Sequence, residues 1–105
     1  MVMEAQIKAR NFTGAKAMAA IIEDMPDKFY IVAKGQVEAN DITGAKTTAA
    51  VIDDKLNKAM AYRDIADAQV KAGDKKGALQ SIALAKEAAA GIEDKVTKAS
   101  FTLWQ

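Results

Sequence analysis

The sequence predicts an all-α fold, in which antiparallel helical hairpins stack into a right-handed superhelix of about seven helices and three repeats. Three observations favour this fold. Alanine, the best helix former, occupies 23 of 105 positions, and the chain has a single proline. Apolar residues recur at spacings of three and four, which is the period of one helix face. The sequence also repeats itself, and internal repetition is the signature of stacked helical units.

The repetition is clearest around three glycines, Gly14, Gly44 and Gly77, which lie 30 and 33 residues apart. Each glycine lies eight residues after a glutamine and directly before an alanine. The three glutamines are Gln6, Gln36 and Gln69. An acidic pair ends each copy, and in the third copy it arrives about seven residues late. Seven residues are about two helical turns, so this insertion lengthens a helix and nearly preserves its facing.

We expect helices at residues 2–10, 14–23, 27–39, 44–53, 56–72, 75–90 and 94–104. The first two hold the first copy and end before Met25-Pro26-Asp27, because proline lacks a backbone donor and its predecessor avoids helical geometry. Residues 27–39 and 44–53 hold the second copy. They form the second expected hairpin.

The third copy gives the clearest hairpin. Its first helix, 56–72, has an apolar stripe and ends at Gly73-Asp74 in the manner of a glycine cap. Its second helix, 75–90, places small residues where the two helices must approach, as at Ala66 and Ala78. We predict one domain over residues 1–105, with repeat units at about 1–24, 27–54 and 58–91 and a C-terminal helix at 94–105.

Composition excludes several kinds of chemistry. The chain has no cysteine and no histidine, so thiolate, zinc–thiolate and histidine-based sites are excluded. We expect no catalytic residue, no cofactor and no metal. The net charge of +1 favours no nucleic-acid partner. No apolar run reaches the roughly 18 residues of a membrane helix. We expect a soluble protein, cytoplasmic or, if a signal peptide was removed, periplasmic.

Three motifs admit a second interpretation. The acidic pairs Glu23-Asp24, Asp53-Asp54 and Glu93-Asp94 could bind a divalent cation, but their place beside lysines favours solvated turns with local ion pairs. The run 73–77 is similar to a phosphate loop but lacks its ending, which favours a turn. The amides of the three glutamines either form hydrogen bonds across adjacent hairpins or to turn backbone, or contact a ligand.

The repeated pattern resembles the tetratricopeptide repeat (TPR) family, in a divergent form. The third hairpin carries Tyr62, Ile65-Ala66, Gln69, Gly73, Ala78, Ile82 and Ala85 at the family's offsets. The second carries Phe29, Val32-Ala33, Gln36, Asn40, Ala45, Ala49 and Ile52. The first is half present, with Gln6, Arg10, Ala15, Ala19 and Ile22. The resemblance implies a scaffold that binds a protein or peptide and performs no catalysis through the repeat itself.

The resemblance also implies a concave binding face, formed by the first helix of each hairpin. By register, the partner-binding residues are Tyr30, Lys34, Val37, Glu38, Arg63, Asp67, Val70 and Lys71, with Glu4 and Lys8 in the first unit. The mixed charges argue against a purely anionic or purely cationic ligand.

A second hypothesis is structural. The chain is similar to alanine-rich arrays of bacterial proteins with many copies, and would then be an oligomerisation module of a longer repeat protein. The apolar residues Phe101, Leu103 and Trp104 either cap the third hairpin or mediate self-association to a homo-oligomer.

Overall fold

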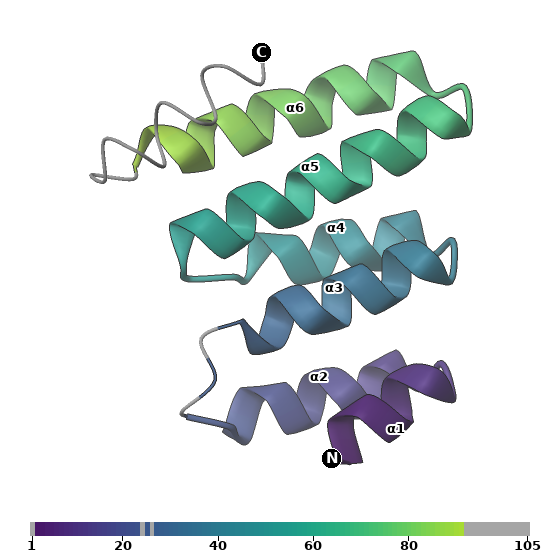
Figure 1. Cartoon of the computed structure of the whole chain (residues 1–105), viewed down its shortest axis with the longest axis vertical. Coiled ribbons are helices and arrows are strands. Elements are labelled where there is room, and N and C mark those ends of the chain that lie inside the picture. The colour runs from purple at the N-terminus through teal and green to yellow at the C-terminus, as the bar shows by residue number, and fades with distance from the viewer. Residues whose placement is uncertain (1, 24, 26, 92–105) are drawn as a thin grey trace.

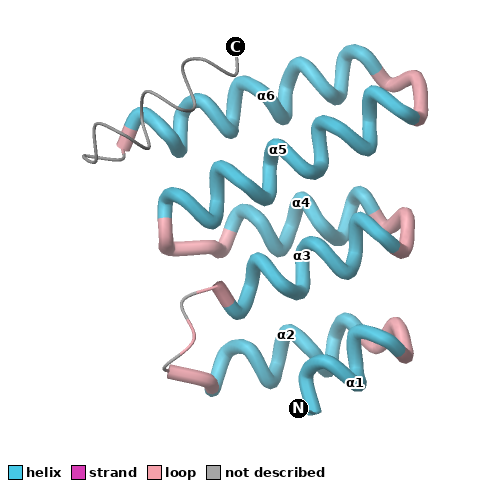
Figure 2. The backbone as a smooth tube through the Cα atoms, viewed as in Figure 1, coloured by secondary structure: helices cyan, strands magenta, loops and turns pink. Residues whose placement is uncertain are grey.

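The structure, a computed structural model, describes residues 2–23, 25 and 27–91. These residues form helices and no strand, so the predicted all-α class is confirmed (Figure 2). The six helices within these ranges are α1 (Val2–Lys8), α2 (Phe12–Ile21), α3 (Lys28–Glu38), α4 (Ile42–Ala50), α5 (Lys55–Lys71) and α6 (Lys75–Ala90). The seventh expected helix, 94–104, lies outside the described residues.

The helices form three antiparallel pairs, α1/α2, α3/α4 and α5/α6, which follow one another in chain order along the longest axis (Figure 1). The molecule measures 37 × 33 × 16 Å. Each pair contacts the next through α2 with α3 and through α4 with α5. The first helices of successive pairs also touch, α1 with α3 and α3 with α5. These contacts bring α3 and α5 side by side.

The turn inside each pair has one common geometry. Its first residue has a positive φ, and the next residue's N–H donates to the carbonyl of the glutamine five positions earlier. The residues with positive φ are Arg10 (62°), Asn40 (63°) and Gly73 (82°). The donors are Asn11 to Gln6 (2.7 Å), Asp41 to Gln36 (2.8 Å) and Asp74 to Gln69 (2.8 Å). This pattern ends each first helix, and at Gly73 it confirms the predicted glycine cap.

The same three donor residues then cap the second helices. The side-chain Oδ1 of Asn11, Asp41 and Asp74 accepts a hydrogen bond from the N–H of the glycine three positions on. Such a cap satisfies an N–H that would otherwise have no partner at the helix start. Consequently α2 and α4 begin two residues before the glycines at which we expected them to start. It also identifies residues 73–77 as a turn leading into a helix.

Gly44 and Gly77, in the first turns of α4 and α6, lie too close to neighbouring side chains to carry a Cβ atom. A Cβ at Gly44 would lie 2.2 Å from Asp41 Oδ2 and 2.7 Å from Gln36 Nε2. At Gly77 the corresponding distances, to Asp74 Oδ2 and Gln69 Nε2, are 2.2 and 2.6 Å. All four distances are too short for a contact with a Cβ atom. The capping carboxylate and the glutamine therefore occupy the space of the missing side chain.

The core is made mainly of small residues. Fully or almost fully buried alanines lie on α2 to α6, among them the predicted close-approach residues Ala66 and Ala78. Larger buried residues are few, and include Val32, Ile65 and the ring of Tyr62. Because alanine projects only a methyl group, the helices lie close together, and small changes in volume are felt throughout the core.

Candidate functional site

A groove between α3 and α5 contains most of the residues expected to bind a partner. Its volume is about 520 Å³. It is lined by Tyr30, Lys34, Val37, Glu38, Arg63, Asp64, Asp67, Ala68 and Lys71. Seven of the eight residues placed on this face by register therefore line one groove. Val70 is the exception, because it does not line the groove and is 57% exposed.

A hydrogen bond joins the two helices across the groove. The hydroxyl of Tyr30 on α3 donates to Oδ2 of Asp64 on α5 over 2.7 Å. The register of the repeat places Arg63, the equivalent of Tyr30, on this face and does not include Asp64, so sequence reasoning missed this acceptor. The sequence indicates this acceptor only by placing the carboxylate of Asp64 directly after Arg63.

Tyr30 is held in its protonated form. Burial, followed by the hydrogen bond to Asp64 and the charge of that carboxylate, raises the pKa of Tyr30 to about 12. Glu38 acts in the same direction, whereas Arg63 lowers the pKa. Near neutral pH the Tyr30 hydroxyl is therefore a hydrogen-bond donor bound to Asp64. It is not a general base.

The groove carries charges of both signs. Lysine and arginine contribute three cations, and glutamate and aspartate contribute three anions. One opposite pair is joined: Lys71 Nζ lies 3.1 Å from Asp67 Oδ2, with both side chains largely exposed. An exposed pair of this kind contributes little to stability and can exchange its partner for a ligand. The groove thus presents separated positive and negative groups to a polar chain.

The remaining predicted interface residues lie elsewhere. Lys8 is exposed on α1. Glu4 is also on α1, but its side chain lies outside the described part of the structure, as do Phe101, Leu103 and Trp104.

The three glutamines have different partners. Gln36 and Gln69 are buried, and their Oε1 atoms accept hydrogen bonds from Thr48 Oγ1 (2.6 Å) and Ser81 Oγ (2.7 Å). These bonds run between the two helices of one hairpin, and the burial of both glutamines keeps their amides from a ligand. The structural interpretation is therefore correct for this pair, although we expected partners in adjacent hairpins or the turn backbone. The Oε1 atom of Gln6 is buried without a hydrogen-bond partner among the described residues.

The acidic pairs show no metal site in the part of the chain that the structure describes, where no group of three or more carboxylates comes together. Asp54 instead caps α5, accepting a hydrogen bond from the N–H of Asn57 (2.9 Å). The expected local ion pair is wrong at Lys55, which donates to the carbonyl of Gly91 (3.4 Å) and forms no ion pair with Asp53 or Asp54. Lys28 donates to the carbonyl of Ile22. Its expected partner Asp24 lies outside the described residues.

Comparison with models of known protein families, with characterised proteins and with solved structures gives no match. Across residues 2–23, 25 and 27–91, no helix has the length and apolar character needed to cross a membrane.

Proposed function

We propose that this chain is a divergent TPR-like array that binds a peptide, or an extended segment of a partner protein, in the groove between α3 and α5. One observation carries the proposal: seven residues chosen by register alone line a single groove. The role is recognition, without catalysis. The residues of the groove supply charge, hydrogen-bonding groups and shape.

Two features support the array. The three turns have the same hydrogen bonds, as copies of one unit would. In addition, the first helices of successive pairs contact one another, whereas within the described residues no comparable packing joins α2 to α4 or α4 to α6. Closer spacing on one side of a stack makes it curve toward that side. The first helices, which carry the groove, would then lie on the concave surface.

The groove favours a ligand of mixed charge. Lys34 and Arg63 suit carboxylates, and Glu38 suits a lysine or arginine of the ligand. Val37 offers a small apolar contact. The Tyr30–Asp64 bond fixes the distance between the two walls before any ligand arrives, which lowers the entropy cost of binding.

The test uses a random peptide library displayed on phage, selected against the whole chain. Selected peptides are synthesised, and their affinities are measured by fluorescence anisotropy for two variants with the same loss of charge. Lys34→Ser/Arg63→Ser alters the groove, and Lys76→Ser/Lys86→Ser alters exposed positions on α6. We expect the groove variant to bind about tenfold more weakly, a change of about 1.4 kcal/mol. Equal affinity of the two variants, or a library that yields no binder, would contradict the proposal.

A second candidate function, self-association, is favoured by the surface of α6. Leu79 is 68% exposed and Leu84 is 39% exposed. In the two earlier units the position of Leu79 is a lysine, at Lys16 and Lys46. A solvated position has thus become apolar on the last described helix. We expect sedimentation velocity to show association with rising concentration, and Leu79→Lys to weaken it. A chain that sediments as a monomer throughout the range would refute this candidate.

A further inference from the structure

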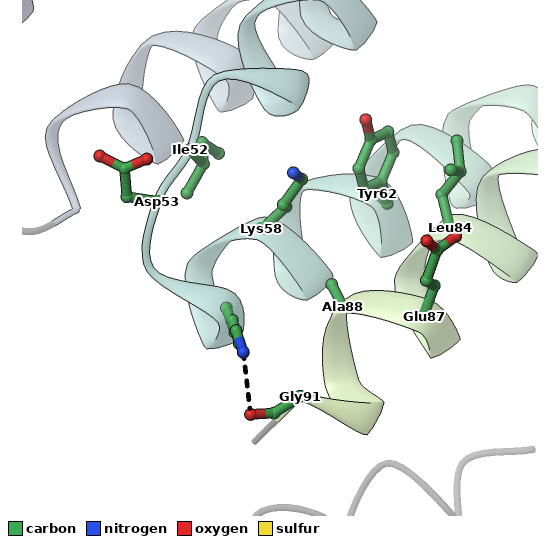
Figure 3. Close-up of a pocket in the computed structure, with 9 residues that line it drawn as sticks. Ile52, Asp53, Lys58, Tyr62, Leu84, Glu87, Ala88 and Gly91 are labelled. Atoms are coloured by element: carbon green, nitrogen blue, oxygen red, sulfur yellow. Dashed lines mark hydrogen bonds between the residues drawn. The ribbon is translucent and has the colours of Figure 1, made fainter. Parts of the chain in front are cut away.

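A second pocket, remote from the groove, lies where the α4–α5 connection meets α5 and α6 (Figure 3). Its volume is about 380 Å³, within the range of small-molecule sites. The lining combines an apolar wall with charged groups: Ile52, Asp53, Lys55, Lys58, Tyr62, Leu84, Glu87, Ala88 and Gly91. In Figure 3 the side chains of Lys58, Tyr62, Leu84 and Glu87 project to the same side of α5 and α6.

The hydroxyl of Tyr62 is the polar end of a largely buried residue that lines this pocket. The residue is only 6% exposed and its ring packs in the core. Yet the hydroxyl makes no hydrogen bond to any other described residue, in contrast to Tyr30, which is bound to Asp64. Burial, and then the charge of Glu87, raises the pKa of Tyr62. The pocket therefore holds a neutral phenol next to a carboxylate.

The chain contains its own comparison. The corresponding seam between the first two hairpins forms a pocket of about 440 Å³, in which Phe29 stands at the position of Tyr62. Phe29 packs against both core clusters without a hydroxyl. Packing at this position thus requires an aromatic ring and nothing more. The hydroxyl of Tyr62 is therefore not needed for packing, and it lines the pocket without a hydrogen bond to another described residue.

The charges of the pocket are balanced but not joined. Asp53 and Glu87 contribute two carboxylates, and Lys55 and Lys58 two ammonium groups. Lys55 is bound to the carbonyl of Gly91. Among the described residues, none of these four groups forms an ion pair within the pocket. Within the described part of the structure, Lys58 and Glu87 are thus unpaired and can bind opposite charges of a ligand, beside the apolar wall of Ile52 and Leu84.

We propose that this pocket binds a small zwitterion with an apolar side chain, of the class of a free amino acid such as leucine. The ammonium of Lys58 binds the ligand's carboxylate. The carboxylate of Glu87 and the hydroxyl of Tyr62 bind its ammonium group, and Leu84 and Ile52 contact its side chain. This site is separate from the groove between α3 and α5, so each can fail without the other.

The first experiment is an NMR titration of the ¹⁵N-labelled chain with L-leucine. Two analogues serve as matched probes: isovalerate, which lacks the ammonium group, and isoamylamine, which lacks the carboxylate. We expect saturable shifts at the pocket residues with leucine, and affinities at least about tenfold weaker with either analogue, because each loses charge-assisted hydrogen bonds. Absence of saturable shifts with leucine, or equal binding of an analogue, would overturn the proposal.

Variants then test the assigned roles. Tyr62→Phe reproduces the residue that the chain already uses at the equivalent position, so it should fold and bind leucine about tenfold more weakly. Lys58→Gln should weaken binding by a similar factor. Lys86→Gln removes the same charge from an exposed position of α6 outside the pocket and should leave binding unchanged. Undiminished binding by Tyr62→Phe, or an equal loss in Lys86→Gln, would refute the assignment.

Discussion

The unpartnered Oε1 of Gln6 predicts that a hydroxyl at position 18 will stabilise the chain. In the second and third hairpins the buried glutamine accepts a bond from a hydroxyl twelve residues later, at Thr48 and Ser81. The residue twelve positions after Gln6 is Met18, which has no proton to donate. Met18→Thr would supply the missing donor in the geometry that the other two hairpins already use.

The size of the effect follows from the cost of an orphaned acceptor. A buried polar atom without a partner costs about 1–3 kcal/mol, and a formed hydrogen bond contributes about 1 kcal/mol. Met18 also packs against the first core cluster, and its replacement loses part of that contact. Met18→Val is the appropriate control, because valine has threonine's shape without its hydroxyl. We expect the threonine variant to be about 1–2 kcal/mol more stable than the valine variant.

The measurement is urea denaturation followed by circular dichroism, from which the free energy of unfolding is extrapolated. The same pair is then compared in a Gln6→Leu background, where the hydroxyl has no acceptor. The advantage of threonine should disappear there, as the two positions couple only through this bond. If threonine and valine are equally stable with Gln6 present, the hydroxyl–glutamine bond is not what holds these hairpins, and the reasoning is wrong.

Further predictions concern the turns and the groove. Gly44→Ala should lose about 1–3 kcal/mol despite alanine's higher helix propensity, because its Cβ would meet the Asp41 carboxylate; urea denaturation measures this. Gly73→Ala should lose only about 1–2 kcal/mol by the same measurement, since its φ is positive but nothing crowds it. Asp54→Ala should lose about 1 kcal/mol of unfolding free energy with the α5 cap. Tyr30 has a folded pKa raised from 10.0 to about 12, so the folded chain keeps a proton that the unfolded chain loses. The contribution of Tyr30 to the free energy of unfolding should therefore be fully present below pH 10 and fall by about 1–2 kcal/mol as the pH rises to 12. Unfolding of the wild type and Tyr30→Phe at pH 9 and pH 11.5 should show a smaller loss in the variant, and equal losses would contradict this assignment.

The helices could be predicted because local chemistry decides them. The predicted helix 75–90 agrees with α6 at both ends. The starts of α2 and α4 differ because a capping side chain begins each helix earlier. Expected starts at 14 and 44 overlooked the caps at Asn11 and Asp41, which lie outside the periodic apolar pattern. In addition, α1 ends at Lys8 and not at residue 10. Arg10 adopts a positive φ, which the sequence does not predict because arginine does not favour this conformation.

The groove could be predicted as a set of positions but not as a set of interactions. Register fixes which face of α3 and α5 a residue occupies, and this was enough to bring seven residues together. It does not fix the offset between the two helices. That offset, set by the alanine-rich core, pairs Tyr30 with Asp64 and leaves Val70 outside. The pocket at Tyr62 was missed because the repeat pattern places Tyr62, like Phe29, at a core position. The pattern does not indicate that the Tyr62 hydroxyl lines a pocket.

The equivalent positions of the three units separate what builds the fold from what can recognise a ligand. The glutamines at the first-helix ends and the glycines of the second helices recur unchanged, because a turn with one geometry allows few alternatives. Positions that line the groove do not recur: Tyr30 corresponds to Arg63, and Lys34 to Asp67. If this surface had no role beyond solvation, any polar residue would serve there, and exchanging the side chains of one unit for those of the next would leave peptide binding unaltered. If the groove recognises a partner, the same exchange must abolish binding while the turns and the core stay intact. The difference between units, and not their likeness, is therefore where specificity must lie.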